Sequence, residues 1–505
     1  MVNYQFTEGT ICAPATIPGT GAISIIRVSG KEALAIADKI IDLKGESLSE
    51  TEGYRLRYGT VFGADGSVLD NVIVSVFRAP HSYTGENSVE ISCHASRFIV
   101  NSILELLVNA GARIAAPGEF TRRAFVNGKM DLAQAEAVAD VIASQSAASH
   151  KVAMNQLKGG FSSELKVLRD KLLKMTSLLE LELDFSEEDV EFASRSELGS
   201  LVSEALSHIG RLTDSFSRGN AIKNGVPVAI VGATNTGKST LLNALLGEER
   251  AIVSDIAGTT RDTIEETLNL GGVLFRFIDT AGIRETDEIV EKIGIERTFK
   301  KLDEASIVLG MTDLSRGENS VLADAEYIWD KVNASSSGQE FLLLVNKCDV
   351  DESESVMAGE GHVAGYAGTG FTETGSGAGS ADKAGKMARI EAALREKGIS
   401  AKLIPISAKT GYGLTVLTEA LAEIGRRITG DTDETLVTNI RHYEALVRAA
   451  TALGRVRDGL QVATLPPDLI AQDLREALYH LGEIVGEIST EEVLGNIFRN
   501  FCVGK

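Results

Sequence analysis

The stretch GATNTGKST, residues 232–240, decides how the middle of this 505-residue chain must fold. It follows the apolar run PVAIV, and its last two residues begin the helical pattern STLLNALLG. Its Gly-x4-Gly-Lys-Ser spacing lets backbone N–H groups turn inward around phosphates at a helix N-terminus. Lys238 then places a positive charge on the β- and γ-phosphates, and the Ser239 hydroxyl is a ligand for Mg²⁺. The predicted nucleotide-binding residues here are Asn235, Thr236, Gly237, Lys238, Ser239 and Thr240.

Two later motifs indicate which base is bound. NKCD, residues 346–349, ends the strand pattern FLLLV, and SAK, residues 407–409, follows the strand pattern LIPI. A carboxylate at Asp349 accepts two hydrogen bonds from guanine, through N1–H and the exocyclic amine, and adenine does not present these donors. The motifs therefore favour GTP over ATP. The residues concerned are Asn346, Lys347, Asp349, Ser407, Ala408 and Lys409.

Two motifs between these complete a metal and γ-phosphate site. In DTAG, Asp279 is expected to hold the Mg²⁺ shell and the Gly282 N–H to meet the γ-phosphate, while Thr260 of GTTRD reaches the metal. Loops of this kind are ordered by the γ-phosphate and released on hydrolysis, so GTP binding and hydrolysis are expected to drive a conformational change. The predicted nucleotide-binding residues are Ser254, Asp255, Ile256, Ala257, Gly258, Thr259, Thr260, Asp279, Thr280, Ala281 and Gly282.

The residue after DTAG is Ile283, which cannot orient water for hydrolysis. Another cation and another polar group must take over. The side-chain carbonyl of Asn235, beside the β/γ bridge, suits a monovalent cation that neutralises developing charge. Four acids follow Ile283 as candidates for positioning water, and the residues alone leave open which of them acts: Glu285, Asp287, Glu288 and Glu291.

Hydrophobic patterns divide the chain into four segments. Residues 1–125 mix strand and helix patterns, residues 126–222 and 429–505 read as long helices, and residues 223–428 alternate short apolar strands with helices. The last pattern predicts a doubly wound, mostly parallel sheet. We expect a multidomain α/β plus α protein with this GTPase segment inserted into one helical domain. A Gly-rich stretch at about 356–387 has little aliphatic bulk and is predicted to be a flexible insertion.

Composition narrows the function further. The net charge of −21 argues against a protein that binds nucleic acid over its whole surface, so any RNA contact must be local. The basic pairs Arg122–Arg123 and Arg441–His442 are interpreted as solvated surface. Four widely spaced cysteines predict free thiols, and no long apolar run or targeting signal is present, which makes a cytoplasmic location the expectation.

Several motifs together give the chain a family resemblance. GATNTGKST, GTTRD, DTAGIRETDEIVEKIGIE, NKCD and the terminal FCVGK resemble those of the tRNA-modification GTPases called MnmE or TrmE. The resemblance extends to IPGTGAISIIRVSG and PGEFTRRAFVNGKMDLAQAEAVADVI and covers nearly the whole chain outside the Gly-rich stretch. It implies a K⁺ ion held by Asn235, Ser254, Ile256 and Thr259, and it assigns the water-orienting role to Glu291.

The resemblance also implies a one-carbon site. Alone, Arg27, Glu90 and Lys129 are unremarkable charges. The residues alone favour Cys502 as a small buried hydrophobe over the alternative of a functional thiolate. In the family, the N-terminal domain binds formyl- or methylene-tetrahydrofolate, which maps onto Arg27, Glu90, Lys129 and Lys505, and Cys502 is needed for modification. Lys238, Glu291 and Cys502 are the implied catalytic residues.

The implied reaction is an aminomethyl-type modification at carbon 5 of the wobble uridine of certain tRNAs. It implies a homodimer joined to a flavoprotein partner, MnmG or GidA, as a heterotetramer. Two alternatives remain open from the sequence. One is a GTP-switched RNA or ribosome assembly factor without folate chemistry, and the other is an autonomous folate-dependent methyltransferase that needs no flavin partner.

Overall fold

The computed structural model describes most of the chain, in two compact units. The described residues are 9–63, 65–184, 195–250, 266–278, 304–334, 338–349, 377–430, 434–462, 466–488, 490–499, 501–502 and 504. Unit 1 contains residues 1–143, 153–213 and 440–505, and unit 2 contains residues 144–152 and 214–439. Within the described residues, each unit has one sheet.

The sheet of unit 1 is almost entirely antiparallel, with strand order β3-β4-β5-β6-β2-β1-β7. Only β1 and β7 pair in parallel. The apolar runs AISIIRVSG, NVIVSVFRAP and SVEISCHAS predicted β2, β5 and β6, whereas β4, which is as long as β6, and the short strands β1, β3 and β7 were not predicted. The strands are β1 Ile11–Pro14, β2 Gly21–Ser29, β3 Ile41–Asp42, β4 Arg55–Phe62, β5 Val68–Phe77, β6 Ser88–Ala95 and β7 Arg113–Ile114.

Alternation along these strands gives the sheet two different faces. Ile26, Val74 and Ile91 are fully buried on one face, in a core closed by the helices α1, Ala33–Asp38, and α2, Arg97–Asn109. Because successive side chains point to opposite sides, the residues between them lie on the other face. That face carries Arg27 and Glu90, which are register partners on β2 and β6.

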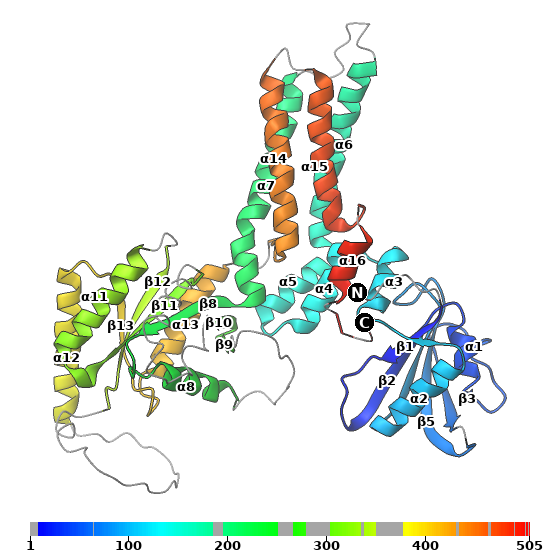
Figure 1. The fold of residues 1–505 in the computed structure, drawn as a ribbon, viewed down its shortest axis with the longest axis horizontal. Helices are drawn as coiled ribbons and strands as arrows, with labels where there is room; N and C mark the ends of the chain where they lie inside the picture. Colours follow the sequence, from blue (N-terminus) through cyan, green and yellow to red (C-terminus); the bar gives the residue numbers. More distant parts are fainter. Residues whose placement is uncertain are drawn as a thin grey trace. The chain divides into compact units, whose positions relative to one another are not determined.

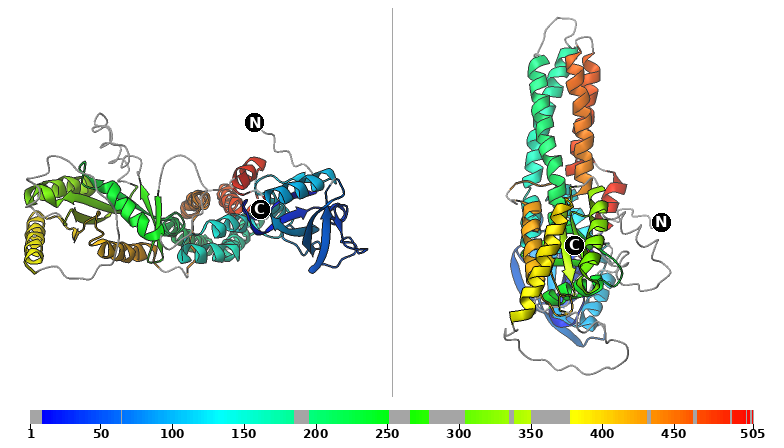
Figure 2. Two further views of the ribbon diagram at one scale, coloured as in Figure 1. Left: turned by 90° about the horizontal axis from the view of Figure 1, so that it is seen from below. Right: turned by 90° about the vertical axis from the view of Figure 1, so that its left-hand side faces the viewer.

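The rest of unit 1 is helical, as predicted. In Figure 1 and Figure 2, α6, α14, α15 and the first part of α7 run side by side as a bundle. Residues more than 250 positions apart in the chain therefore share one helical core. The helices are α3 Glu119–Val126, α4 Leu132–Ala143, α6 Gly160–Asp184, α14 Ile440–Gln461, α15 Pro467–Val485 and α16 Glu491–Arg499, with α5 Ala147–Leu157 and α7 Arg195–Asn224 crossing between the units.

A buried charge cluster joins these helices, which corrects the interpretation of Arg441–His442 as solvated surface. Arg441 donates from Nε to Glu136 Oε1 at 2.9 Å, and His442 Nε2 lies 2.7 Å from Glu136 Oε2. His442 is 1% exposed and stacks on Phe161. The pair is buried because its acidic partner lies on α4, some 300 residues earlier, where no local pattern shows it. Arg123 is likewise paired, with Glu86 and Glu119.

Unit 2 has the predicted doubly wound sheet, with strand order β13-β12-β11-β8-β10-β9. All neighbours are parallel except β10 and β9. The antiparallel edge strand β9 was not predicted, because ETLNL is short and only half apolar. The strands are β8 Val226–Gly232, β9 Glu266–Leu270, β10 Val273–Ile278, β11 Ile307–Asp313, β12 Glu340–Asn346 and β13 Lys402–Pro405.

Helices cover both faces of this sheet. α8, Lys238–Arg250, and α13, Leu414–Thr429, pack on one face through residues such as Leu241 and Leu421. α11, Glu318–Ala334, and α12, Gly377–Glu396, pack on the other through Ile328 and Ile390. A short 3₁₀ helix, Leu314–Arg316, follows β11.

The prediction for the Gly-rich stretch is wrong over its last residues. Residues 377–387 of the Gly-rich stretch are helical, since α12 already begins at Gly377; residues 356–376 lie outside the described residues. Once the apolar turns at Ile390 and Leu394 are anchored on the sheet, extending a helix backwards takes little free energy. α7 continues to Asn224 through the buried residues Ala221 and Ile222. No helix that the structure describes combines the length and apolar character needed to span a membrane.

We predict that Glu136→Ala loosens the helical core of unit 1. Burial alone would raise the pKa of Glu136, but the charges and hydrogen bonds of His442 and Arg441 outweigh it and lower the pKa to about 2. Removing the carboxylate takes the acidic partner away from the partly buried Arg441 guanidinium and the buried His442 ring, which costs about 3–5 kcal/mol. Hydrogen exchange of α4 and α14 peptides at pH 7 should therefore accelerate by at least about 100-fold.

The control is Glu52→Ala, which breaks the exposed Arg55–Glu52 pair and should leave exchange nearly unchanged. In the wild type, the contribution of Glu136 is present above about pH 4.5, its ordinary pKa, and is lost as the pH falls towards 2. Equal protection of α4 and α14 in Glu136→Ala and wild type would contradict a stabilising role for the cluster.

Candidate functional site

The loop between β8 and α8 has the backbone shape of a phosphate cradle. Asn235 and Gly237 both have positive φ, 61° and 98°, so the chain turns twice within three residues. A Cβ on Gly232 would lie 2.3 Å from the Met311 carbonyl oxygen, and a Cβ on Gly237 would lie 2.4 Å from Asn346 Nδ2. Only glycine fits at these positions, because no real Cβ approaches another atom so closely.

Lys238 begins α8 and curls back over this loop. Its Nζ donates to the carbonyl oxygens of Gly232 and Ala233, both at 2.8 Å. Burial lowers the pKa of the Lys238 ammonium. The ammonium therefore lies at the loop itself, where it can meet a phosphate held by the loop N–H groups. Ser239 and Thr240 follow in the first turn of α8, as predicted for a metal-ligating hydroxyl and its neighbour.

Asn346 ties the phosphate loop to the base-binding loops. Its Nδ2 donates to the Thr236 carbonyl at 2.7 Å, and its Oδ1 accepts from the Ala408 N–H at 3.0 Å. The side chain is 3% exposed, so neither bond competes with bulk water. One amide thus connects three loops that are up to 172 positions apart in the sequence, between Thr236 and Ala408.

The base-binding loops lie side by side. The Cys348 N–H donates to the Ile406 carbonyl at 3.2 Å, which holds NKCD against SAK. Asp349 is exposed just beyond, available to a purine edge, while Ser407 is fully buried. Lys347 has positive φ, 62°, and its Nζ lies 2.6 Å from Asp313 Oδ2. Burial would raise the pKa of Asp313, but hydrogen bonds from Lys347 and Ser315 outweigh it and lower the pKa.

The switch segments fall outside the described residues. β10 ends at Ile278, immediately before the predicted Asp279. The predictions for Ser254, Asp255, Ile256, Ala257, Gly258, Thr259, Thr260, Asp279, Thr280, Ala281, Gly282 and Glu291 all concern residues outside the described ranges.

Arg27 forms the centre of a second polar site, on the sheet face of unit 1 opposite the core. Its Nε donates to Glu90 Oε1 at 2.9 Å across the β2–β6 pair. Its guanidinium carbon lies 5.2 Å from the ring centroid of Tyr83 and 5.7 Å from that of Phe120. The side chains of Arg27 and Glu90 are about 20% and 25% exposed, so this ion pair is accessible to a ligand.

Lys129 lies in the loop after α3, with its Nζ 3.0 Å from the Pro80 carbonyl oxygen. The C-terminal segment approaches the same sheet at β1: a Cβ on Gly504 would lie 2.0 Å from the Pro14 carbonyl oxygen. Pro14 and Ala13 pair with Ile26 and Arg27. Lys505 lies outside the described residues.

Cys502 is exposed, so its interpretation as a small buried hydrophobe is wrong. The other three cysteines are buried. Burial raises the pKa values of Cys12 and Cys93 to about 11, which keeps both as thiols at neutral pH.

Sequence reasoning did not assign Tyr83 or Phe120 to the Arg27 site, or Asp313 to the nucleotide site. The sequence around these residues did not indicate these contacts. Tyr83 lies in the turn-rich stretch HSYTGEN, Phe120 lies in PGEFTRRAF, and Asp313 ends the apolar run ASIVLGMTD. Only the fold shows that they contact Arg27 and Lys347.

Unit 2 is a P-loop GTPase domain. It is defined by its mostly parallel sheet, by the phosphate loop that requires glycine, and by the NKCD and SAK loops that lie side by side. The same chain also contains the helices and the antiparallel sheet of unit 1. A family model described as "MnmE helical domain" matches residues 132–502, and one described as "GTP-binding protein TrmE N-terminus" matches residues 10–129.

Curated relatives match over the full length. "tRNA modification GTPase MnmE" of Parabacteroides distasonis is 49% identical over 98% of this chain and 100% of its own. Proteins of that name from Bacteroides fragilis strain YCH46 and Flavobacterium johnsoniae are 48% and 46% identical, each over 99% of this chain and 100% of their own. The chain belongs to the MnmE, or TrmE, family of tRNA modification GTPases.

Proposed function

We propose that this GTPase uses a tetrahydrofolate one-carbon unit to modify carbon 5 of the wobble uridine of certain tRNAs, together with a flavin-dependent partner. The product carries an aminomethyl or carboxymethylaminomethyl group. The observation that carries the proposal is the presence, in one chain, of a formed GTP site and of the Arg27–Glu90 site beside the C-terminal segment. The four-segment division at 1–125, 126–222, 223–428 and 429–505 belongs to the same proposal, as does a cytoplasmic location.

The Arg27 site fits a reduced folate chemically. A pterin presents adjacent donors and acceptors, which match the carboxylate of Glu90 and the guanidinium of Arg27. The half-buried ring of Tyr83 beside Arg27 supplies an apolar wall for a flat heterocycle, and the fully buried Phe120 ring supports Arg27 from within. Lys129 and Lys505 suit the anionic glutamate tail. The bound folate would supply the one-carbon unit, and glycine or ammonium would supply the nitrogen.

For hydrolysis, we propose that K⁺ and Glu291 do the work that Ile283 cannot. Asn235 is exposed in the phosphate loop with positive φ, so its side-chain carbonyl is accessible to a cation held with Ser254, Ile256 and Thr259. Ser239 and Thr260 would hold Mg²⁺. A cation beside the β/γ bridge stabilises charge that develops in the transition state.

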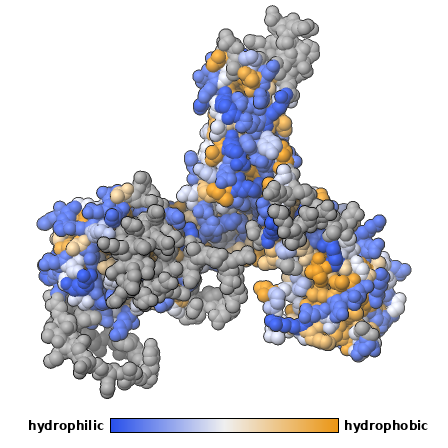
Figure 3. Space-filling model, viewed as in Figure 1, coloured by the Kyte–Doolittle hydropathy of each residue, from blue (hydrophilic) through white to orange (hydrophobic). Residues whose placement is uncertain are grey.

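We further propose a homodimer that associates with a flavoprotein partner of the MnmG type. Leu56, Tyr58 and Ile73 lie on the sheet face that carries Arg27 and are 65%, 62% and 48% exposed. Hydrophobic side chains are also visible on the surface of this part of the chain in Figure 3. Exposed apolar side chains gathered on one face are typical of a protein interface.

Reduced folate binding tests the one-carbon part of the proposal. We predict that 5-formyltetrahydrofolate, titrated calorimetrically into the full chain, binds the wild type and binds Arg27→Ala at least about 10-fold more weakly, because the variant loses a charged hydrogen-bonding partner. Arg55→Ala, at an exposed ion pair on the same sheet, is the matched control and should bind as the wild type does. No binding by the wild type would favour the assembly-factor alternative.

GTP turnover tests the hydrolysis mechanism. We predict faster turnover in K⁺ than in Na⁺ at equal ionic strength, and a loss of at least about 100-fold in Asn235→Ala and in Glu291→Ala. Asn220→Ala, on α7, is the control for an unrelated asparagine. Equal rates in the two salts would remove K⁺ from the mechanism, and a fully active Glu291→Ala would remove that glutamate.

A further inference from the structure

The sheet of unit 2 fixes where the nucleoside of a bound GTP must lie. β8 leads into the phosphate loop, β12 leads into NKCD, and β11 lies between these two strands. Parallel strands end at the same edge of a sheet, and the ligands of such sheets bind beyond that edge. A nucleotide with its phosphates beside β8 and its base beside β12 therefore crosses the end of β11. That end is Asp313, the register partner of Asn346 on β12.

The Asp313 carboxylate is buried at this edge and is bonded through both oxygens. Its Oδ1 accepts hydrogen bonds from the Ser315 N–H at 3.0 Å and from the Ser315 hydroxyl at 2.6 Å. Its Oδ2 accepts from Lys347 Nζ at 2.6 Å. Asp313 is only 5% exposed, so it does not reach a nucleotide directly. Any effect of Asp313 on the ligand must pass through a neighbour, and Lys347 is the neighbour in the base-binding loop.

The backbone at Lys347 is held from both sides. The amide of Asn346 is bonded at both ends, and the Cys348 N–H donates to the Ile406 carbonyl at 3.2 Å. Between them, Lys347 has a φ of 62°, in the left-handed region that residues other than glycine rarely adopt. The loop therefore decides the direction in which the Lys347 side chain leaves the backbone, and the contact with Asp313 decides where its far end lies.

The ion pair brings the Lys347 side chain across the strand edge. Its ammonium lies against Asp313, which ends β11, while its backbone follows β12. The methylene stem between these two points therefore lies over the boundary of the two strands, where the nucleoside crosses. The side chain is 36% exposed, so part of the stem offers an apolar surface to a ligand.

A solvated lysine would not supply a fixed surface of this kind. A long lysine side chain loses much rotamer freedom when it is held in one place, and an exposed ion pair rarely offsets that loss. Here the partner is a buried carboxylate that two Ser315 bonds hold in position. The lysine geometry therefore exists before the nucleotide binds, which lowers the entropy cost of binding.

We propose that Asp313 is a positioning residue for GTP: it holds Lys347 across the end of β11, so that the lysine stem forms a fixed floor under the nucleoside. Lys347 makes the contact, and Asp313 acts through it. Asp313 lies outside the nucleotide motifs of the sequence, at the end of the run ASIVLGMTD. This role concerns GTP binding alone, so it goes beyond the proposed folate chemistry and does not depend on it.

The test is calorimetric titration of GDP into the full chain, with GTP turnover measured on the same preparations. Asp313→Asn keeps the size of the side chain but has one acceptor oxygen in place of two. It should weaken GDP binding at least about 10-fold and raise the KM for GTP by a similar factor, with kcat within about 2-fold of the wild type. Ser315→Ala, at an exposed position, removes one of the bonds that hold Asp313 and should weaken GDP binding by a smaller factor.

Two further measurements show whether Asp313 acts through Lys347. In a Lys347→Met background, which has the stem but no ammonium, Asp313→Asn should change GDP affinity by less than about 2-fold, because the pair is already broken. Inosine diphosphate lacks only the exocyclic amine that Asp349 is predicted to bind. Asp313→Asn should therefore weaken GDP and inosine diphosphate by the same factor, since the floor contacts both equally.

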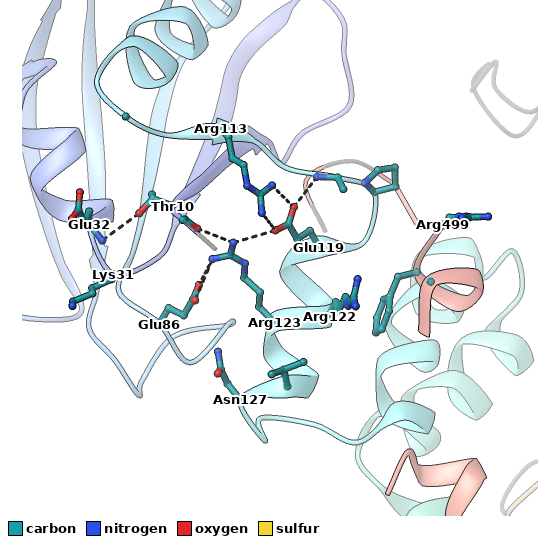
Figure 4. A pocket seen from close by; sticks show the side chains of 17 residues that line it. Thr10, Lys31, Glu32, Glu86, Arg113, Glu119, Arg122, Arg123, Asn127 and Arg499 are labelled. Carbon is teal, nitrogen blue, oxygen red and sulfur yellow. Dashed lines mark hydrogen bonds and ion pairs between the residues drawn. The ribbon is translucent and has the colours of Figure 1, made fainter. Parts of the chain in front are cut away.

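Two carboxylate-to-amide changes outside the site are the controls. Glu318→Gln removes the charge of the Arg389–Glu318 pair in unit 2 and should leave GDP binding unchanged. Glu119→Gln, in unit 1, is the control for lost stability: its carboxylate bridges Arg113 and Arg123, at 2.8 Å and 3.1 Å (Figure 4). This variant should bind GDP as the wild type does, even at a lower melting temperature.

Wild-type GDP affinity in Asp313→Asn would overturn the proposal. So would a fall in kcat without a change in GDP affinity, because Asp313 would then act on hydrolysis. Equal effects of Asp313→Asn in the wild-type and Lys347→Met backgrounds would show that it does not act through Lys347, and a larger loss for GDP than for inosine diphosphate would place its effect at Asp349. An equal loss of affinity in Glu119→Gln would reduce the result to general stability.

Discussion

The two ends of the chain meet at a contact that glycine alone permits. A Cβ on Gly504 would lie 2.0 Å from the Pro14 carbonyl oxygen, and one on Gly118 would lie 2.6 Å from the Phe498 carbonyl oxygen. Backbone therefore packs on backbone at both places, and the C-terminal segment is held against β1 and the start of α3. The Arg27 site and Cys502 are both near this contact, so unit 1 depends on it for any chemistry at the C-terminus.

The GTPase unit follows the same principle of joining distant loops through one buried contact. Asn346 holds the phosphate loop through Thr236 and the base-binding loop through Ala408, and both hydrogen bonds are buried away from solvent. Burial strengthens these bonds, and it also makes the loss of either partner expensive. The phosphate loop and the two base-binding loops are therefore held in one arrangement around the nucleotide site.

The sequence was sufficient to predict structural features that depend on residues close together in the chain. Short apolar runs predicted β2, β5, β6, β8 and the strands beside β8, and the GATNTGKST spacing predicted the phosphate loop with Lys238 at the start of a helix. It was insufficient where a partner lies far along the chain. Arg441 and His442 looked like surface charges because Glu136 is about 300 residues away, and Tyr83 and Phe120 carry no sign of Arg27. Long-range ion pairs and ring contacts depend on the fold, which local pattern does not encode.

The central claim is that one protein couples GTP hydrolysis to folate-dependent uridine modification. The most direct measurement is nucleoside mass spectrometry of tRNA after reaction with the full chain, its flavin-dependent partner, reduced folate, GTP and K⁺. The account predicts modified wobble uridine with the wild type and with Arg55→Ala, and none with Arg27→Ala or with Lys238→Ala. Full modification by Arg27→Ala, or modification by Lys238→Ala at the wild-type level, would contradict it.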